Sequence, residues 1–71
     1  MNKEQKELII SQCKEILARW QIDVTKFSYR VDEESEKRFF IAVRRNGKNY
    51  FEINAYTDSE FTIVQYEIDF S

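Results

Sequence analysis

The hydrophobic pattern divides the chain into one helical segment and four strand-like segments. In residues 3–20 the apolar positions recur at helical spacing and form a single stripe: Ile9, Cys13, Ile16, Leu17 and Trp20. Asn2 stands where a helix N-cap is expected, and Gln5, three residues later, completes the pattern of a capping box. These features predict an amphipathic helix that buries one side.

Alternation of apolar with polar residues marks the four later segments, which are rich in β-branched and aromatic residues. They span about Val24–Val31, Arg38–Arg45, Asn49–Tyr56 and Phe61–Phe70. The links between them are short, so consecutive strands are expected to pair as an antiparallel meander. The helix must cover one sheet face, because otherwise both elements would leave an apolar side in water. The sequence therefore predicts an α+β fold, a single compact domain over residues 1–71 with one N-terminal helix packed on a four-stranded antiparallel β-meander of order 1-2-3-4.

The turn between the second and third strands sets their register. A two-residue turn at 46–47 would leave both sheet faces partly apolar, although Asn-Gly commonly forms such a turn. A three-residue loop at 45–47, with Gly47 left-handed, pairs Ile41 with Phe51 and brings the apolar side chains of both strands to one face. We therefore expect the three-residue loop.

The last hairpin fits a four-residue loop without adjustment. Phe51 then pairs with Tyr66, and Ile53 pairs with Val64, all facing the helix. In this register the predicted core comprises Ile9, Cys13, Ile16, Leu17, Trp20, Phe27, Tyr29, Phe39, Ile41, Val43, Phe51, Ile53, Val64, Tyr66 and Ile68.

On the opposite sheet face, the same register leaves aromatic and acidic side chains in water. Tyr56 would lie opposite Phe61, and Tyr50 opposite Glu67. The outer face of such a sheet is expected to be polar, so a group of large apolar side chains on it indicates an interaction surface. The candidate partner-binding residues are Phe40, Tyr50, Glu52, Tyr56, Phe61, Ile63, Glu67 and Asp69. Two alternatives stay open: two such faces pack together in a homodimer, or the aromatics only satisfy strand propensity.

The charge distribution indicates what kind of partner this face suits. The net charge is −2, but all 11 basic residues lie in positions 1–48, which carry a net +3, whereas positions 49–71 carry −5. A charge-polarised domain steers its encounters with other molecules. An acidic, aromatic face suits a basic surface on a larger protein, such as that of a nucleic-acid enzyme.

Composition excludes several classes of function. The chain has no His and one Cys, which excludes a zinc finger, a His-dependent nucleophilic pair and an internal disulfide. Cys13 lies in the helical stripe and is expected to be a buried hydrophobic residue. The acidic run 32–36 lacks the spacing of a calcium loop, and no glycine-rich phosphate loop is present. We therefore expect no cofactor, no metal and no catalytic residue.

The sequence also lacks an apolar run of about 18 residues and a signal-peptide pattern. We therefore expect a cytoplasmic protein without a membrane partner. The favoured hypothesis is a small non-catalytic inhibitor or regulator that docks on a larger protein, comparable to an immunity protein, an antitoxin or a phage-encoded inhibitor.

The alternative from a different class is a single-stranded nucleic-acid binder. Basic residues around the second strand, interleaved with aromatics, could hold phosphates while bases stack: Arg38, Arg44, Arg45 and Lys48. Against this reading, Glu52 and Glu67 on the neighbouring strands would repel phosphates.

Overall fold

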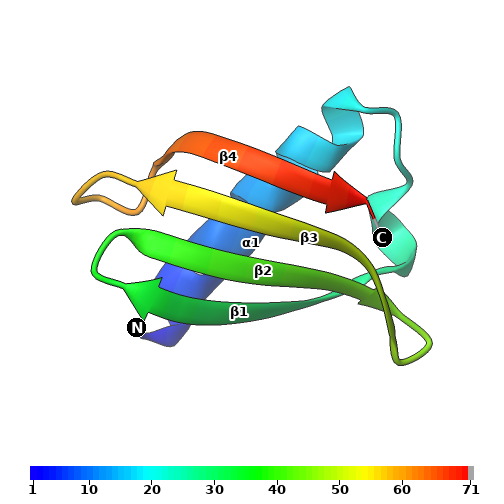
Figure 1. Ribbon diagram of the computed structural model, residues 1–71, viewed down its shortest axis with the longest axis horizontal. Coiled ribbons are helices and arrows are strands. Elements are labelled where there is room, and N and C mark those ends of the chain that lie inside the picture. Colours follow the sequence, from blue (N-terminus) through cyan, green and yellow to red (C-terminus); the bar gives the residue numbers. More distant parts are fainter. Residues whose placement is uncertain (71) are drawn as a thin grey trace.

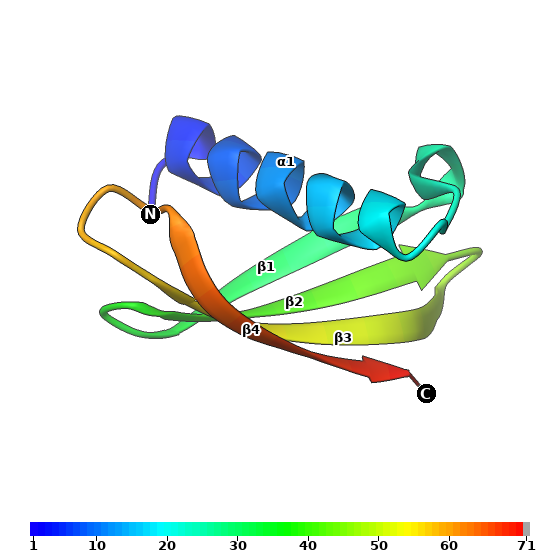
Figure 2. The same ribbon diagram turned by 90° about the horizontal axis from the view of Figure 1, so that it is seen from above.

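A computed structural model describes residues 1–70 and shows one long helix, a short 3₁₀ helix and four strands (Figure 1). In chain order these are α1 (Lys3–Arg19), η1 (Val24–Lys26), β1 (Ser28–Ser35), β2 (Arg38–Arg45), β3 (Lys48–Thr57) and β4 (Ile63–Phe70). The strands form one antiparallel sheet of order β1-β2-β3-β4, and α1 crosses one of its faces (Figure 2). The predicted α+β fold, a helix on a four-stranded meander, is confirmed.

Helix α1 begins with the predicted capping box. Asn2 Oδ1 accepts a hydrogen bond from the Gln5 amide at 2.8 Å, and Gln5 Oε1 accepts one from the Asn2 amide at 3.1 Å. These bonds satisfy backbone donors that the first turn of a helix leaves without partners. The helix ends at Arg19, and Gln21 adopts a left-handed φ of 60°, so the chain turns directly after the helix.

The prediction that Trp20 belongs to the core is wrong. Trp20 is the C-cap residue, and it is 57 % exposed. Because the helix has ended, the backbone no longer directs this side chain along the buried stripe. Its ring instead lies edge-on to that of Phe70, with centroids 6.1 Å apart.

The first strand begins and ends later than the sequence pattern predicts. The Asp23 carboxylate accepts hydrogen bonds from the amide and the hydroxyl of Thr25, at 3.0 and 2.7 Å, and these bonds hold the 3₁₀ turn η1. They also lower the pKa of the Asp23 carboxyl. Strand β1 then continues to Ser35, through much of the acidic run 32–36 that lies between the two predicted strands, because its backbone stays paired with β2.

The turn between β2 and β3 has two residues rather than the predicted three. Arg45 pairs with Lys48, and between them Asn46 and Gly47 adopt φ values of 53° and 77°. Both values lie in the left-handed region that a type I′ turn requires, and Asn-Gly favours this turn. The turn therefore follows the local preference of the dipeptide.

A β-bulge reconciles this turn with a one-sided core. The register shifts by one after Val43, which makes Tyr50 the extra residue of β3. The extra residue reverses the alternation of β3, so its odd-numbered side chains face the helix as predicted. The individual pairs differ from the prediction, since Ile41 lies opposite Ile53 rather than Phe51.

A second bulge changes the predicted orientation at the start of β4. The register of β3 with β4 shifts by one after Tyr56, and Val64 becomes the extra residue. Val64, predicted to be core, is 67 % exposed. Phe61 and Ile63, predicted to face outward, pack against the core instead.

The loop before β4 is closed by Asp58, whose carboxylate accepts hydrogen bonds from the amides of Glu60 and Thr62 at 2.8 and 3.0 Å. Beyond the bulge, β4 is displaced relative to the predicted pairs. Ile53 lies opposite Ile68 rather than Val64, and Phe51 lies opposite Phe70 rather than Tyr66.

The core lies between α1 and the inner face of the sheet. Most of the predicted core residues are buried or packed against it: Ile9, Cys13, Ile16, Leu17, Phe27, Tyr29, Phe39, Ile41, Val43, Phe51, Ile53, Tyr66 and Ile68. The prediction omits Val31, Ala42, Ala55 and Thr57, which are also buried.

Candidate functional site

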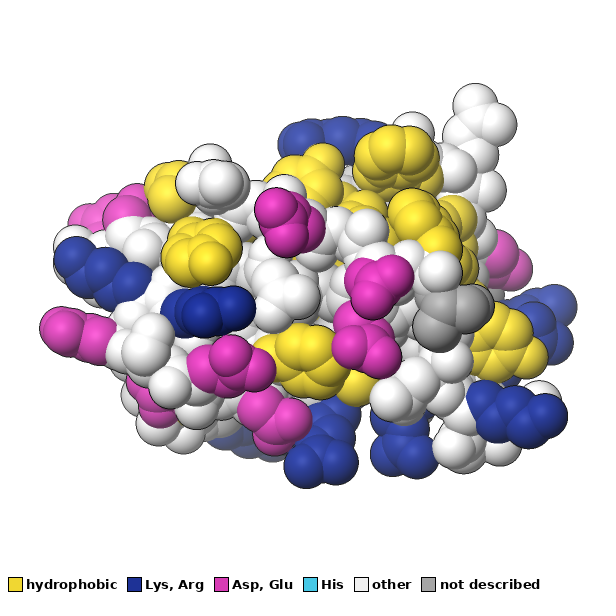
Figure 3. Space-filling view, in the orientation of Figure 1, with side chains coloured by type: hydrophobic (Ala, Val, Ile, Leu, Met, Phe, Trp, Pro, Cys, Tyr) yellow, Lys and Arg dark blue, Asp and Glu magenta, His cyan; other side chains and the backbone are white. Residues whose placement is uncertain are grey.

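The outer face of the sheet, turned away from α1, carries a group of carboxylates on its last two strands. Glu52 of β3 lies directly opposite Asp69 of β4, and Glu67 lies on the same face opposite Asn54. We call Glu52, Glu67 and Asp69 the acidic triplet. Figure 3 shows this face, with carboxylates across its centre, basic groups along its lower margin and at its left, and the largest apolar group towards the upper right.

The acidic triplet has no counter-charge within ion-pair distance among residues 1–70. The ion pairs of this part of the chain lie elsewhere and join Met1 to Glu33, Arg30 to Asp32, and Arg38 to Glu34. Like charges placed directly opposite on neighbouring strands destabilise a sheet. The Glu52–Asp69 pair is therefore an unfavourable feature of the isolated protein.

Two aromatic side chains share the face with the acidic triplet. Tyr56 is 38 % exposed, and the Arg38 guanidinium carbon lies 5.6 Å from the centroid of its ring. Phe40 of β2 is half-buried and lies opposite Asn54 of β3. Together they give the charged face an apolar contact area.

The structure therefore brings five of the eight predicted partner-binding residues together on one face: Phe40, Glu52, Tyr56, Glu67 and Asp69. Tyr50 is the bulge residue, and its ring lies edge-on to Phe27, with centroids 6.0 Å apart, rather than opposite Glu67. Tyr56 lies opposite Gln65, and not opposite Phe61 as predicted.

The assignment of Phe61 and Ile63 to the outer face is wrong. The Phe61 ring lies 5.8 Å from that of buried Phe39, and Ile63 packs against the core. The bulge at Val64 turns Ile63 inward, because one inserted residue inverts the side chains that precede it in the strand. Phe61 lies in the loop before β4, where its φ is 64° and strand alternation does not apply.

The basic residues of the nucleic-acid alternative do not form one track. Arg38 begins β2, about 20 Å of strand from the hairpin end that carries the other three, Arg44, Arg45 and Lys48. Arg38 is also paired with Glu34, with the two charged groups 3.8 Å apart, and an Arg44 Nη2 donates to the Gly47 carbonyl at 3.1 Å.

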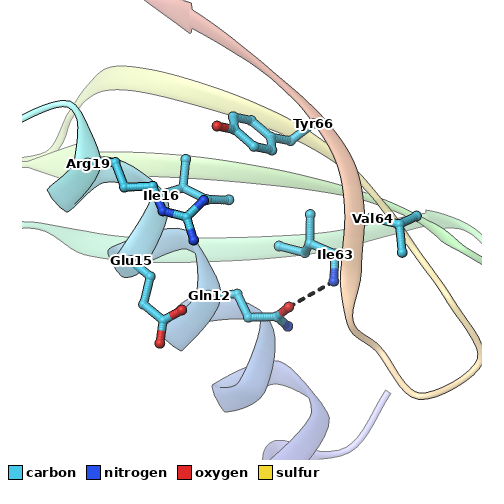
Figure 4. A pocket seen from close by; sticks show the side chains of 7 residues that line it. All are labelled: Gln12, Glu15, Ile16, Arg19, Ile63, Val64 and Tyr66. Atoms are coloured by element: carbon cyan, nitrogen blue, oxygen red, sulfur yellow. Dashed lines mark hydrogen bonds between the residues drawn. The ribbon is translucent and has the colours of Figure 1, made fainter.

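A groove of about 250 Å³ lies between α1 and the start of β4 (Figure 4). Its lining residues are Gln12, Glu15, Ile16, Arg19, Ile63, Val64 and Tyr66. Gln12 bridges the two elements, since its Nε2 donates to the Phe61 carbonyl and its Oε1 accepts from the Ile63 amide, both at 2.8 Å. The sequence gives no sign of this role, because a single polar residue on a helix produces no periodic signal.

Exposed apolar side chains lie on β4 and next to its end. Trp20 is 57 %, Val64 67 % and Phe70 52 % exposed. Trp20 and Val64 were predicted as core, and only the helix end and the bulge place them at the surface.

The thiol and the carboxylates offer no sign of a metal or nucleophilic site in the described part of the chain. Burial of Cys13 raises the pKa of its thiol to about 12, so the reactive thiolate is scarce at neutral pH. No group of three or more Cys, Asp or Glu residues within 1–70 is arranged to hold a metal ion.

Comparison of the chain with known protein families, with curated proteins and with solved structures found no match. Within residues 1–70 there is no helix both long enough and apolar enough to span a bilayer.

Proposed function

We propose that this protein is a non-catalytic binding module that docks the outer face of its sheet on a basic site of a larger protein. The observation that carries the proposal is the acidic triplet: three carboxylates on neighbouring strands with no ion-pair partner among residues 1–70. A cationic surface would relieve the cross-strand repulsion between Glu52 and Asp69, so the partner supplies what the isolated sheet lacks.

The aromatic side chains support docking on a protein rather than on a small cation. Tyr56 and Phe40 lie on the same face as the acidic triplet and provide rigid apolar area, which is typical of residues that anchor protein interfaces. An acidic small protein of this kind would act as an inhibitor or regulator by occupying a site that normally binds nucleic acid.

The absence of a catalytic step in this proposal follows from the chemistry of the chain. The sequence has no His, and the carboxylates of the outer face lie on an open sheet that does not desolvate them.

Charge-neutral variants test the proposal. The triple variant Glu52→Gln, Glu67→Gln and Asp69→Asn keeps side-chain size and removes the charges of the acidic triplet. The matched control neutralises three exposed carboxylates elsewhere, Glu7→Gln, Glu36→Gln and Glu60→Gln, and changes the net charge equally.

Each protein is immobilised and used to capture partners from lysate of the native host, with quantification by mass spectrometry. We expect the wild type and the control to retain the same basic protein and the triple variant to lose it. Equal retention by all three proteins would refute the docking face. Capture of single-stranded nucleic acid alone would instead favour the basic strand β2.

A further inference from the structure

We infer that the partner adds an extended segment of its own to the free edge of β4 as a fifth strand, and that this segment alternates basic with apolar residues. The inference rests on the proposed docking of a basic partner and specifies which part of that partner enters.

The free edge of β4 has backbone groups available for pairing. Strand β4 is last in the sheet order and pairs only with β3. Half of the N–H and C=O groups of an edge strand point away from the sheet. Among residues 1–70, no side chain and no loop backbone forms a hydrogen bond with the backbone of 64–70. Figure 2 looks onto this edge, and none of the described elements lies in front of it.

Gln12 already engages the beginning of this edge in the way that a strand would. Its carboxamide donates to the Phe61 carbonyl and accepts from the Ile63 amide. In a parallel pair of strands, one residue donates to a carbonyl of its neighbour and accepts from the amide two residues further along. The Phe61 carbonyl and the Ile63 amide have this spacing. The backbone at the start of β4 is thus satisfied by a strand mimic, and the residues from 64 onward are left for a real strand.

The two sides of β4 determine the side chains that a fifth strand needs. On the inner side Ile63 and Tyr66 line the groove of about 250 Å³ shared with Ile16 of α1. That volume is below the roughly 300–1,000 Å³ typical of small-molecule sites, so it suits single side chains. Its apolar lining comes from Ile16, Ile63 and Val64, beside polar Gln12, Glu15 and Arg19. On the outer side lie Glu67 and Asp69. Because side chains of a strand alternate between faces, the added segment must alternate apolar with basic residues.

Charge disfavours a second copy of the chain as this strand. Two β4 strands paired edge to edge, with their inner sides on one face, would bring Glu67 and Asp69 of both copies onto the same face.

The other edge of the sheet, strand β1, carries charges on both of its sides, which protects it from strand addition. Arg30 and Asp32 lie on the outer side, and Glu33 lies on the inner side, where it forms an ion pair with the N-terminal amine at 3.9 Å.

The test uses defined peptides and the full chain. The first probe is a fluorescent, capped eight-residue peptide of alternating lysine and valine. The second has the same sequence with every backbone nitrogen methylated, which keeps the charge and removes the N–H donors of both strand edges. The third replaces every lysine with glutamate. Fluorescence anisotropy gives each affinity, and hydrogen exchange reports on the amides of 64–70.

We expect the lysine–valine peptide to bind and to slow exchange of β4 amides, and the N-methylated and glutamate peptides to bind at least about tenfold more weakly. The double variant Glu67→Lys and Asp69→Lys should reverse the preference and select the glutamate peptide. Its far-ultraviolet circular dichroism checks that it folds.

Equal binding of the lysine–valine peptide and its N-methylated form would overturn strand addition while leaving electrostatic docking intact. Absence of binding by the lysine–valine peptide would overturn it too. The proposed function fails separately, when neutralising the acidic triplet leaves partner capture unchanged.

Discussion

Gln12 should contribute more to stability than its position on a helix surface suggests. Its carboxamide joins α1 to a segment about 50 residues later in the chain, through two partly buried hydrogen bonds of 2.8 Å. In Gln12→Ala, the Phe61 carbonyl and the Ile63 amide lose their partners. A buried polar group left unsatisfied costs about 1–3 kcal/mol.

The size of the effect follows from these two groups. Because both bonds are only partly buried, we take about 1 kcal/mol for each and subtract about 0.5 kcal/mol for the better helix propensity of alanine. The free energy of unfolding should fall by about 1.5 kcal/mol, and Tm by roughly 6–12 °C for a domain of this size. The total stability expected for such a chain is about 4–10 kcal/mol.

Urea unfolding followed by circular dichroism measures this change, with Glu15→Ala as the control. Glu15 is exposed on the same helix, so its removal should change the free energy of unfolding by less than about 0.5 kcal/mol. In Gln12→Glu the ionised carboxylate still accepts from the Ile63 amide but repels the Phe61 carbonyl. Protonation of this carboxylate restores a donor, so the stability deficit of the variant relative to wild type should shrink as the pH is lowered. If Gln12→Ala is as stable as Glu15→Ala, the bridge has no energetic role.

Three further predictions concern the core, the first hairpin and the thiol. Phe39 is fully buried, so Phe39→Ala should cost about 3–5 kcal/mol and leave much of the protein unfolded at 37 °C; a cooperative unfolding curve like that of wild type would contradict this. A Cβ at Gly47 would meet nothing within 4 Å, but its φ is +77°, so Gly47→Ala should cost only the backbone strain, about 1 kcal/mol in urea unfolding. Because burial raises the pKa of Cys13 to about 12, iodoacetamide at pH 8 should alkylate the native protein far more slowly than the urea-unfolded chain, as mass spectrometry would reveal; similar rates would show that the thiol is accessible.

The chain specifies its secondary structure largely through local signals. The stripe from Ile9 to Leu17 and the Asn2–Gln5 capping box define α1. Alternation alone places Phe39, Ile41 and Val43 on the buried face of β2. These signals depend only on side-chain spacing relative to the helical and strand repeats, so they are legible without knowledge of distant contacts.

The register and the exact composition of the outer face depend on tertiary structure. The bulge residues Tyr50 and Val64 carry no local signature, since each arises where turn geometry must be reconciled with packing against the helix. The acidic triplet keeps its predicted face because β4 beyond the second bulge is displaced by four residues, and an even displacement leaves each side chain on the same side of the sheet. Phe61 and Ile63 precede the second bulge and are turned inward.

The sequence by itself thus determined the helix, the four strands and the sign of the charge on the last two strands. Only the tertiary structure decided which residues oppose one another, that Trp20 stays at the surface, and that Gln12 reaches the start of β4. The physical reason is that periodicity fixes how a side chain is oriented within its own element, whereas pairing and bridging contacts depend on where turns, bulges and helix ends place whole elements in space.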